Sequence, residues 1–252
     1  MRVLLLLFVL LLSGGASARE FRLCVDSNEW PPYTYPDHDG LLQRLVRAAA
    51  ARRGDSVTFV ALPWLRCEAT AAAAQLDGLV GVPDTADERE HFVFPSTAGK
   101  VDAKRALAEV EVVLVRRTDI PTAWDGRTLK GVRGRVLYAQ GYGEIAARLR
   151  ALGIPSSDDY RSDGPIIKAL LAGRANVAAT YAEAARRHAE AGDYEGRIAV
   201  MSPALGHFLY YAAFNKSVYE ADPEAVESLW RAVAELRAAP VDPSHPDAIL
   251  SR

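Results

Sequence analysis

The sequence has almost no excess of charge of either sign, because 30 lysine and arginine residues face 32 aspartate and glutamate residues, for a formal net charge of −2. It also lacks any run of basic residues that would concentrate positive charge on one surface. Nucleic-acid binding depends on such residues to neutralise phosphates. The composition therefore argues against a nucleic-acid partner. With 50% hydrophobic residues, it is that of an ordinary globular protein.

The short motifs of common enzyme and metal sites are also missing. The sequence contains no G-x-S-x-G, C-x-x-C or H-E-x-x-H. The five histidines lack the spacing of metal ligands, and we interpret them as surface or packed residues; they are His38, His91, His188, His207 and His245. We therefore expect no catalytic residues of a standard type, no metal and no cofactor.

Long apolar runs are confined to the N-terminus. Met1 and Arg2 precede ten apolar residues, 3–12, and the small residues that follow end in Ala-Ser-Ala at Ala18. A charged start, a short apolar segment and such an end are typical of a secretory signal peptide. A bilayer-spanning helix would need about 20 apolar residues. We expect cleavage after Ala18 and a periplasmic mature protein.

Cysteine is nearly absent, since the chain contains only Cys24 and Cys67. An exported protein matures where thiols oxidise, so we expect these two residues to form a disulfide. The alternative is two buried free thiols, because a small buried cysteine often packs as an apolar residue.

Short strands alternate with helices after Arg19, which is typical of an α/β protein. The expected strands are 21–25, 56–61, 79–82, 110–115, 135–138, 175–180 and 208–214. The expected helices are 41–52, 66–74, 144–152, 166–172, 182–191 and 223–238. Two similar α/β halves predict two lobes with a ligand cleft beyond the carboxyl ends of the strands. We assign 1–18 to the signal peptide, 19–109 and 208–252 to lobe 1, and 110–207 to lobe 2.

A glycine-rich turn follows the strand expected at 135–138. Residues 141–146 fit G-x-G-x-x-A. A dinucleotide site would also need a second strand ending in an acid about 20 residues on, and 154–157 make a poor buried strand. We prefer a strand-to-helix turn whose N–H groups face the cleft, where they suit a carboxylate or another anion.

Aromatic side chains and an arginine follow three successive strands. Trp30 and Tyr33 lie in a proline-stiffened loop after the first strand, Trp64 follows the second, and Arg89 follows the third. Each alone would more often be a core aromatic or a solvated charge. Delivered together to one edge, they predict a small-ligand site.

In this order, these motifs resemble the family 3 extracellular solute-binding proteins, the amino-acid-type receptors of ABC importers. The resemblance covers essentially the whole mature chain and rests on Trp30–Tyr33, Pro63-Trp64, Leu76-Asp77-Gly78, the acidic segment ending in Arg89, Trp124-Asp125-Gly126, Leu129-Lys130-Gly131 and Gln140-Gly141. It implies a two-lobed periplasmic-binding-protein-like (type II) α/β fold, with two crossover strands and a hinged cleft. It also implies that Cys24 and Cys67, on the first strand and second helix, are close enough to bridge.

The resemblance assigns roles to individual residues. Arg89 would hold a substrate carboxylate through its two-pronged donor geometry. Trp30 and Trp64 would sandwich the ligand. The turn formed by Gly141, Tyr142 and Gly143 would meet the carboxylate.

Two positions depart from the family pattern. Asp84 stands where small hydroxyl residues usually precede the arginine, and it could itself pair with Arg89. Tyr181 stands where the second lobe commonly carries an acid for the α-ammonium. A buried ammonium without a partner is costly, so a standard α-amino acid would need Glu183, Glu144 or an aromatic face instead.

The sequence thus predicts a monomeric periplasmic solute-binding protein, not an enzyme, that captures a small polar, carboxylate-bearing ligand for an ABC permease. One alternative is a dehydratase of the cyclohexadienyl type, with Glu144 or Asp84 as general acid. Another is a sensing accessory protein whose closed form docks on a partner. The candidate ligand-binding residues are Trp30, Tyr33, Trp64, Asp84, Arg89, Gly141, Tyr142, Gly143, Glu144 and Tyr181.

Overall fold

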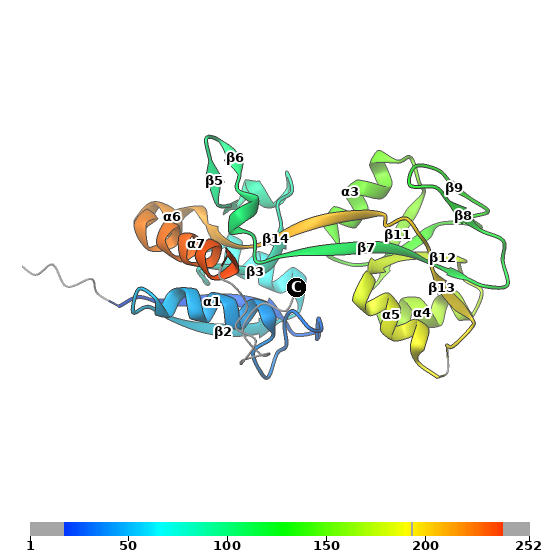
Figure 1. Cartoon of the computed structure of the whole chain (residues 1–252), viewed down its shortest axis with the longest axis horizontal. Helices are drawn as coiled ribbons and strands as arrows, with labels where there is room; N and C mark the ends of the chain where they lie inside the picture. The colour runs from blue at the N-terminus through cyan, green and yellow to red at the C-terminus, as the bar shows by residue number, and fades with distance from the viewer. Residues whose placement is uncertain (1–17, 193, 239–252) are drawn as a thin grey trace, which may run out of the picture.

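The computed structural model describes residues 18–192 and 194–238. The expected signal peptide lies outside the described residues except for Ala18, and so does the end of lobe 1 beyond residue 238. Two groups of helices and strands lie at opposite ends of the long axis, and two long strands connect them (Figure 1). Among the described helices, none combines the length and the apolar character that a membrane crossing requires.

Strands and helices alternate along the chain. The strands are β1 (Glu20–Asp26), β2 (Ser56–Leu62), β3 (Gly78–Pro83), β4 (Phe92–Val93), β5 (Ser96–Thr97), β6 (Lys100–Val101), β7 (Ala108–Arg117), β8 (Ala123–Trp124), β9 (Leu129–Lys130), β10 (Val136–Ala139), β11 (Ser156–Tyr160), β12 (Val177–Tyr181), β13 (Ile198–Val200) and β14 (Gly206–Asn215). The α-helices are α1 (Leu41–Ala51), α2 (Trp64–Ala72), α3 (Gly143–Ala151), α4 (Asp163–Leu171), α5 (Ala182–Glu190), α6 (Lys216–Ala221) and α7 (Pro223–Ala238). Two 3₁₀ turns are η1 (Glu88–Glu90) and η2 (Ala103–Arg105).

One sheet runs through both lobes, in the order β11-β10-β12-β7-β14-β3-β1-β2. Strands β1, β2 and β3 of lobe 1 pair in parallel, as do β10, β11 and β12 of lobe 2. The connecting strands β7 and β14 pair antiparallel with each other, and β14 continues to β3 while β7 continues to β12. Figure 1 shows these two strands crossing between the lobes. The two-lobed α/β architecture expected from the sequence is confirmed.

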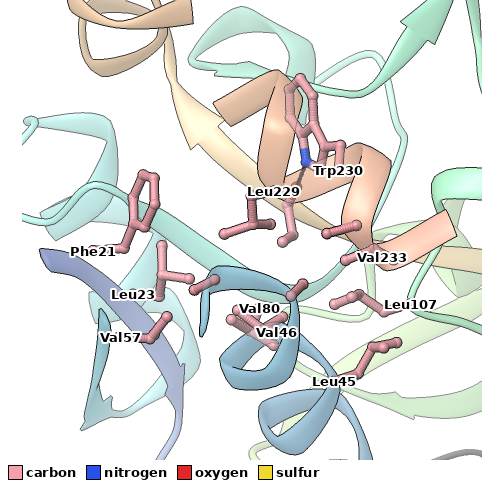
Figure 2. Close-up of a cluster of buried hydrophobic side chains, with 14 of the residues drawn as sticks. Phe21, Leu23, Leu45, Val46, Val57, Val80, Leu107, Leu229, Trp230 and Val233 are labelled. Atoms are coloured by element: carbon pink, nitrogen blue, oxygen red, sulfur yellow. Dashed lines mark hydrogen bonds between the residues drawn. The ribbon is translucent and has the colours of Figure 1, made fainter. Parts of the chain in front are cut away.

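The core of lobe 1 lies between the sheet and the helix pair α1 and α7. On α1, the spacing of Leu42, Leu45, Val46 and Ala49 is that of an amphipathic helix, and all four are buried. Trp230 of α7 is 1% exposed and donates its indole N–H to the carbonyl oxygen of Ala212 at 2.7 Å. Figure 2 shows side chains of both helices and of the strands gathered in this cluster.

The core of lobe 2 is built around β12, which is buried at all five residues. Successive side chains of a strand point to opposite faces. Val177 and Ala179 accordingly join one cluster with Ile145 of α3, whereas Ala178 joins another with Ile166 of α4. Helices therefore cover both faces of the lobe 2 sheet, and the carboxyl ends of its strands lead toward lobe 1.

The two cysteines form the expected disulfide. Cys24 of β1 and Cys67 of α2 are both buried, with their Cα atoms 5.5 Å apart. The described residues contain no free cysteine. The bond connects the first strand to the second helix, and Trp64, the first residue of that helix, packs against the cluster that contains both cysteines.

The strand β11 differs from the sequence prediction, which judged its first residues a poor buried strand. Ser156–Tyr160 pairs parallel with β10 at the edge of the sheet, where none of its side chains is fully buried. An edge strand needs no apolar pattern, because solvent satisfies one of its sides. The glycine-rich turn therefore does lie in a strand-helix-strand unit, although the acids Asp158 and Asp159 are exposed within β11.

Candidate ligand-binding site

A cavity of about 520 Å³ lies between the two lobes. Lobe 1 lines it with the loop after β1, the start of α2 and part of β3, and lobe 2 lines it with the turn before α3, the start of α4, the end of β12 and part of α5. Tyr210 of the crossover strand β14 completes the wall. A volume of this size suits a small molecule.

The structure brings several of the predicted site residues together. Those that line the cavity are Trp30, Trp64, Gly141, Tyr142, Glu144 and Tyr181. Tyr33 does not line it, but its ring packs against that of Trp30 with centroids 4.7 Å apart. Asp84, Arg89 and Gly143 are not among the lining residues.

Arg89 is occupied by an intramolecular partner. Its side chain is 53% exposed, and its Nε and Nη2 both donate to the Asp84 carboxylate, with Nη2 2.6 Å from Oδ2. This two-pronged hydrogen bond raises the pKa of Arg89. The pair that the sequence allowed has therefore formed, and holding a ligand carboxylate with Arg89 would require it to separate.

Glu144 lies in the first turn of α3 and is 3% exposed. The hydroxyl of Tyr210 donates to its Oε1 at 2.7 Å, the hydroxyl of Tyr181 donates at 3.2 Å, and the two hydroxyls are 3.2 Å apart. Burial raises the pKa of Glu144, against the opposing effect of these hydrogen bonds. The N-terminal turn of α3, which favours an anion, therefore already holds a carboxyl group of the protein.

Asp163 is a second acidic lining residue, and the sequence analysis missed it. It accepts hydrogen bonds from Thr180 Oγ1 at 2.6 Å and from the hydroxyl of Tyr142 at 3.3 Å. Burial raises its pKa. The sequence does contain a helix-start signal at this point. A serine at the N-cap, Ser162, is followed by an acid and then by Pro165, which is typical of the first turn of a helix. The helix begins at Asp163, three residues before the predicted 166–172.

Indole rings make contacts between the lobes. Trp30 of lobe 1 has its ring centroid 4.9 Å from that of Tyr181 and 5.1 Å from that of Tyr210. Trp64 lies over Gly141 of lobe 2, since a Cβ added to this glycine would be 2.5 Å from Cδ1 of the indole. The two lobes are thus in contact around the cavity.

Basic residues of the lining were also not predicted. Arg66, Arg161 and Arg187 are exposed, and no described residue forms an ion pair with any of them. His188 lines the cavity as well, so the interpretation of all histidines as surface or packed residues overlooked it. Burial lowers the pKa of His188.

Within residues 18–192 and 194–238, no group of three or more His, Cys, Asp or Glu side chains is arranged to hold a metal ion.

A pair of carboxyl groups lies next to Trp64, outside the cavity lining. Glu68 of α2 and Glu88 of η1 share a hydrogen bond, and Glu68 has a further one with Trp64. Burial raises the pKa of both groups. For Glu88, the charge of Glu68 adds to burial and brings the pKa to about 8.

Replacing this carboxyl with an amide, Glu88→Gln, is expected to stabilise the protein at pH 8 by about 1–2 kcal/mol, with little effect at pH 5. A folded-state pKa above the unfolded value means that the wild type loses stability as pH rises from the usual carboxyl range to about 8. Thermal unfolding at both pH values measures the difference. Glu90→Gln, on the same turn and exposed, is the control. Equal stabilisation at pH 5 and pH 8 would contradict the assignment.

No family model and no curated protein matches this sequence. Solved structures do match its fold. A histidine kinase sensor domain with similarity to periplasmic binding proteins has a TM-score of 0.68 at 17% identity, covering 87% of this chain and 90% of its own. Tv2483 bound to L-arginine has a TM-score of 0.66 at 12% identity, covering 86% and 84%. The ancestral amino-acid-binding protein AncCDT-1, a precursor of cyclohexadienyl dehydratase, has 0.64 at 16%, covering 86% and 89%. The fold is therefore two-lobed and periplasmic-binding-protein-like, as expected.

Proposed function

We propose that the protein binds a small polar solute, an amino acid or a related compound, in the cavity between its lobes. The observation that carries this proposal is that both lobes and the crossover residue Tyr210 line one cavity of about 520 Å³. A ligand that touches both walls favours the closed arrangement, because only there are all of its contacts made. The structural neighbours described as amino-acid-binding or bound to L-arginine support a solute of this size.

We further propose that the protein acts in the periplasm as a monomer and delivers its solute to an ABC-type permease. The signal-peptide pattern and the Cys24–Cys67 disulfide support an exported protein. The similarity to a histidine kinase sensor domain favours sensing as the alternative use of the same binding event. Capture of a permease by the solute-loaded protein distinguishes transport from sensing.

A solute screen tests the binding function. We expect one class within a panel of amino acids, amines and small organic acids to raise the melting temperature. At a ligand concentration one hundred times Kd, binding should increase the free energy of unfolding by about 2.7 kcal/mol. The same class should change the tryptophan fluorescence, because Trp30 and Trp64 line the cavity. Trp30→Phe and Trp64→Phe should reduce that change. Trp124→Phe is the matched control, since Trp124 lies in the lobe 2 core. Absence of binding by every compound would refute the proposal.

A dehydratase is the second candidate, and Glu144 is the observation that favours it. A buried carboxyl with a raised pKa beside a cavity can act as a general acid. One structural neighbour is described as a precursor of cyclohexadienyl dehydratase. Incubation with prephenate or arogenate tests this candidate, and we expect no product because we propose a binding protein.

A further inference from the structure

The charged residues that line the cavity differ in their exposure to water. Glu144 is 3% exposed, and Asp163, Asp26 and His188 are half-buried. The exposed charged residues of the lining are Arg66, Arg161, Arg187 and Glu29. Exposed charges are screened by solvent and salt, whereas buried ones act at close range in a low dielectric. The part of the lining that can bind most strongly is therefore acidic.

Glu144 and Asp163 are surrounded by hydroxyl groups and aromatic rings. Tyr181 and Tyr210 donate to Glu144, and Tyr142 and Thr180 donate to Asp163. The rings of Tyr142 and Tyr181 are 4.7 Å apart. In the described part of the chain, no basic side chain forms an ion pair with either acid, although the nearby His188 and Arg187 act to lower the pKa of Asp163. Aromatic faces and desolvated carboxylates both attract a cation.

The groups that would hold a buried carboxylate of a ligand are engaged elsewhere. Arg89 lies outside the lining and is paired with Asp84. Helix N-termini attract anions, but α3 and α4 each carry a carboxyl group of the protein in the first turn, Glu144 and Asp163. The start of α2 also lines the cavity and carries no acid, but it lies on the exposed part of the lining. The helix N-termini around Glu144 and Asp163 thus each already carry a carboxyl group of the protein.

A buried donor also lacks an acceptor. Trp30 lines the cavity, and its indole N–H is the buried side-chain polar group for which the described residues provide no hydrogen-bond partner. Leaving such a group unpaired destabilises the folded protein, because its water hydrogen bond is lost without replacement. A ligand oxygen next to Trp30 would satisfy it, so the unpaired donor is an observation independent of the acids that points to a ligand.

We propose that the solute is an organic cation, a protonated amine or guanidinium compound, whose positive group binds Glu144 and Asp163 among the tyrosines while one of its oxygens accepts from Trp30. This inference rests on the proposed binding function and specifies its ligand class. A carboxylate on the ligand is not required, because the arginines of the lining are exposed and would add little to the binding energy of a carboxylate. The site therefore differs from one that selects α-amino acids by both of their charged groups.

Calorimetric titration of the full mature chain with three kinds of probe tests this assignment. L-arginine and L-lysine carry cations and a carboxylate. L-argininamide and L-lysinamide keep the cations and a carbonyl oxygen but lose the carboxylate. Succinate and glutarate carry no cation. We expect at least one amide to bind within about tenfold of its parent amino acid, and neither acid to bind.

Variants of the two acids provide the second arm. Glu144→Gln and Asp163→Asn should each weaken amide binding at least tenfold, while melting temperatures show that both variants fold. Glu224→Gln is the control, because Glu224 also lies in the first turn of a helix, α7, but is paired with Arg231 outside the lining. It should bind as the wild type does.

The possible failures are distinguishable. Binding of amino acids or acids but of neither amide overturns the cation assignment and leaves the binding function intact. Unchanged amide affinity in both acid variants overturns the assignment as well. Absence of binding by every probe and every compound of the solute panel overturns both proposals.

Discussion

Replacing Cys24 and Cys67 together with alanine is expected to lower the free energy of unfolding by about 2–4 kcal/mol. The two residues are 43 positions apart in sequence, so their bond removes much conformational freedom from the unfolded chain. Both side chains are buried in the same cluster of lobe 1. For a chain of this length, such a loss lowers the melting temperature by roughly 5–15 °C.

Denaturant unfolding of the double variant and of the wild type, each with and without a reductant, measures this effect. The reduced wild type should approach the double variant, and the variant itself should not respond to reductant. Because Trp64, a cavity residue, packs against the cluster that contains both cysteines, solute affinity should also fall. An unfolding free energy equal to that of the oxidised wild type would show that the bond does not contribute.

Replacing Gly141 with alanine is expected to weaken solute binding by about ten- to hundredfold. Gly141 has a φ of 83°, which an alanine adopts with strain, and the added Cβ would be 2.5 Å from Cδ1 of Trp64. Trp64 belongs to lobe 1 and Gly141 to lobe 2. The indole must therefore move away, and the closed arrangement becomes less favourable.

Gly134→Ala separates this contact from backbone strain. Gly134 has a φ of 80°, and an added Cβ would meet nothing within 4 Å. Both variants should lose similar stability in denaturant unfolding, but only Gly141→Ala should lose affinity. Small-angle scattering should also show a more open Gly141→Ala protein. Equal affinities of the two variants would contradict the role of the Trp64 contact.

Apolar periodicity predicted most of the fold. The continuous run at 175–180 and the helical spacing from Leu42 to Ala49 both indicate elements with buried faces, and both elements form. The strand β11 could not be found in this way, because Ser156–Tyr160 is polar and owes its conformation to pairing with β10. The predicted starts of α2 and α4 are two and three residues too late. At α4 the first residues, 163–165, carry no apolar pattern, and at α2 the apolar Leu65 is exposed and does not follow the buried face.

The candidate site was predictable where aromatic residues follow strands, as at Trp30 and Trp64. It was not predictable where function depends on distant partners. Nothing near Glu144 in the sequence indicates that Tyr210, 66 residues away, donates to it. The pairing of Glu68 with Glu88 likewise depends on how α2 and η1 pack. Charge and spacing alone do not distinguish such residues from solvated ones.

Tyr210 belongs at once to the connection between the lobes and to the wall of the cavity. Its backbone lies in β14, opposite Ala108 of β7 and Pro83 of β3, while its hydroxyl donates to Glu144 of lobe 2. A change in the bend or twist of the two-stranded ribbon therefore displaces a group that lines the cavity. The shape of the cavity wall and the angle between the lobes therefore change together, and a spectroscopic label near Tyr210 would report both.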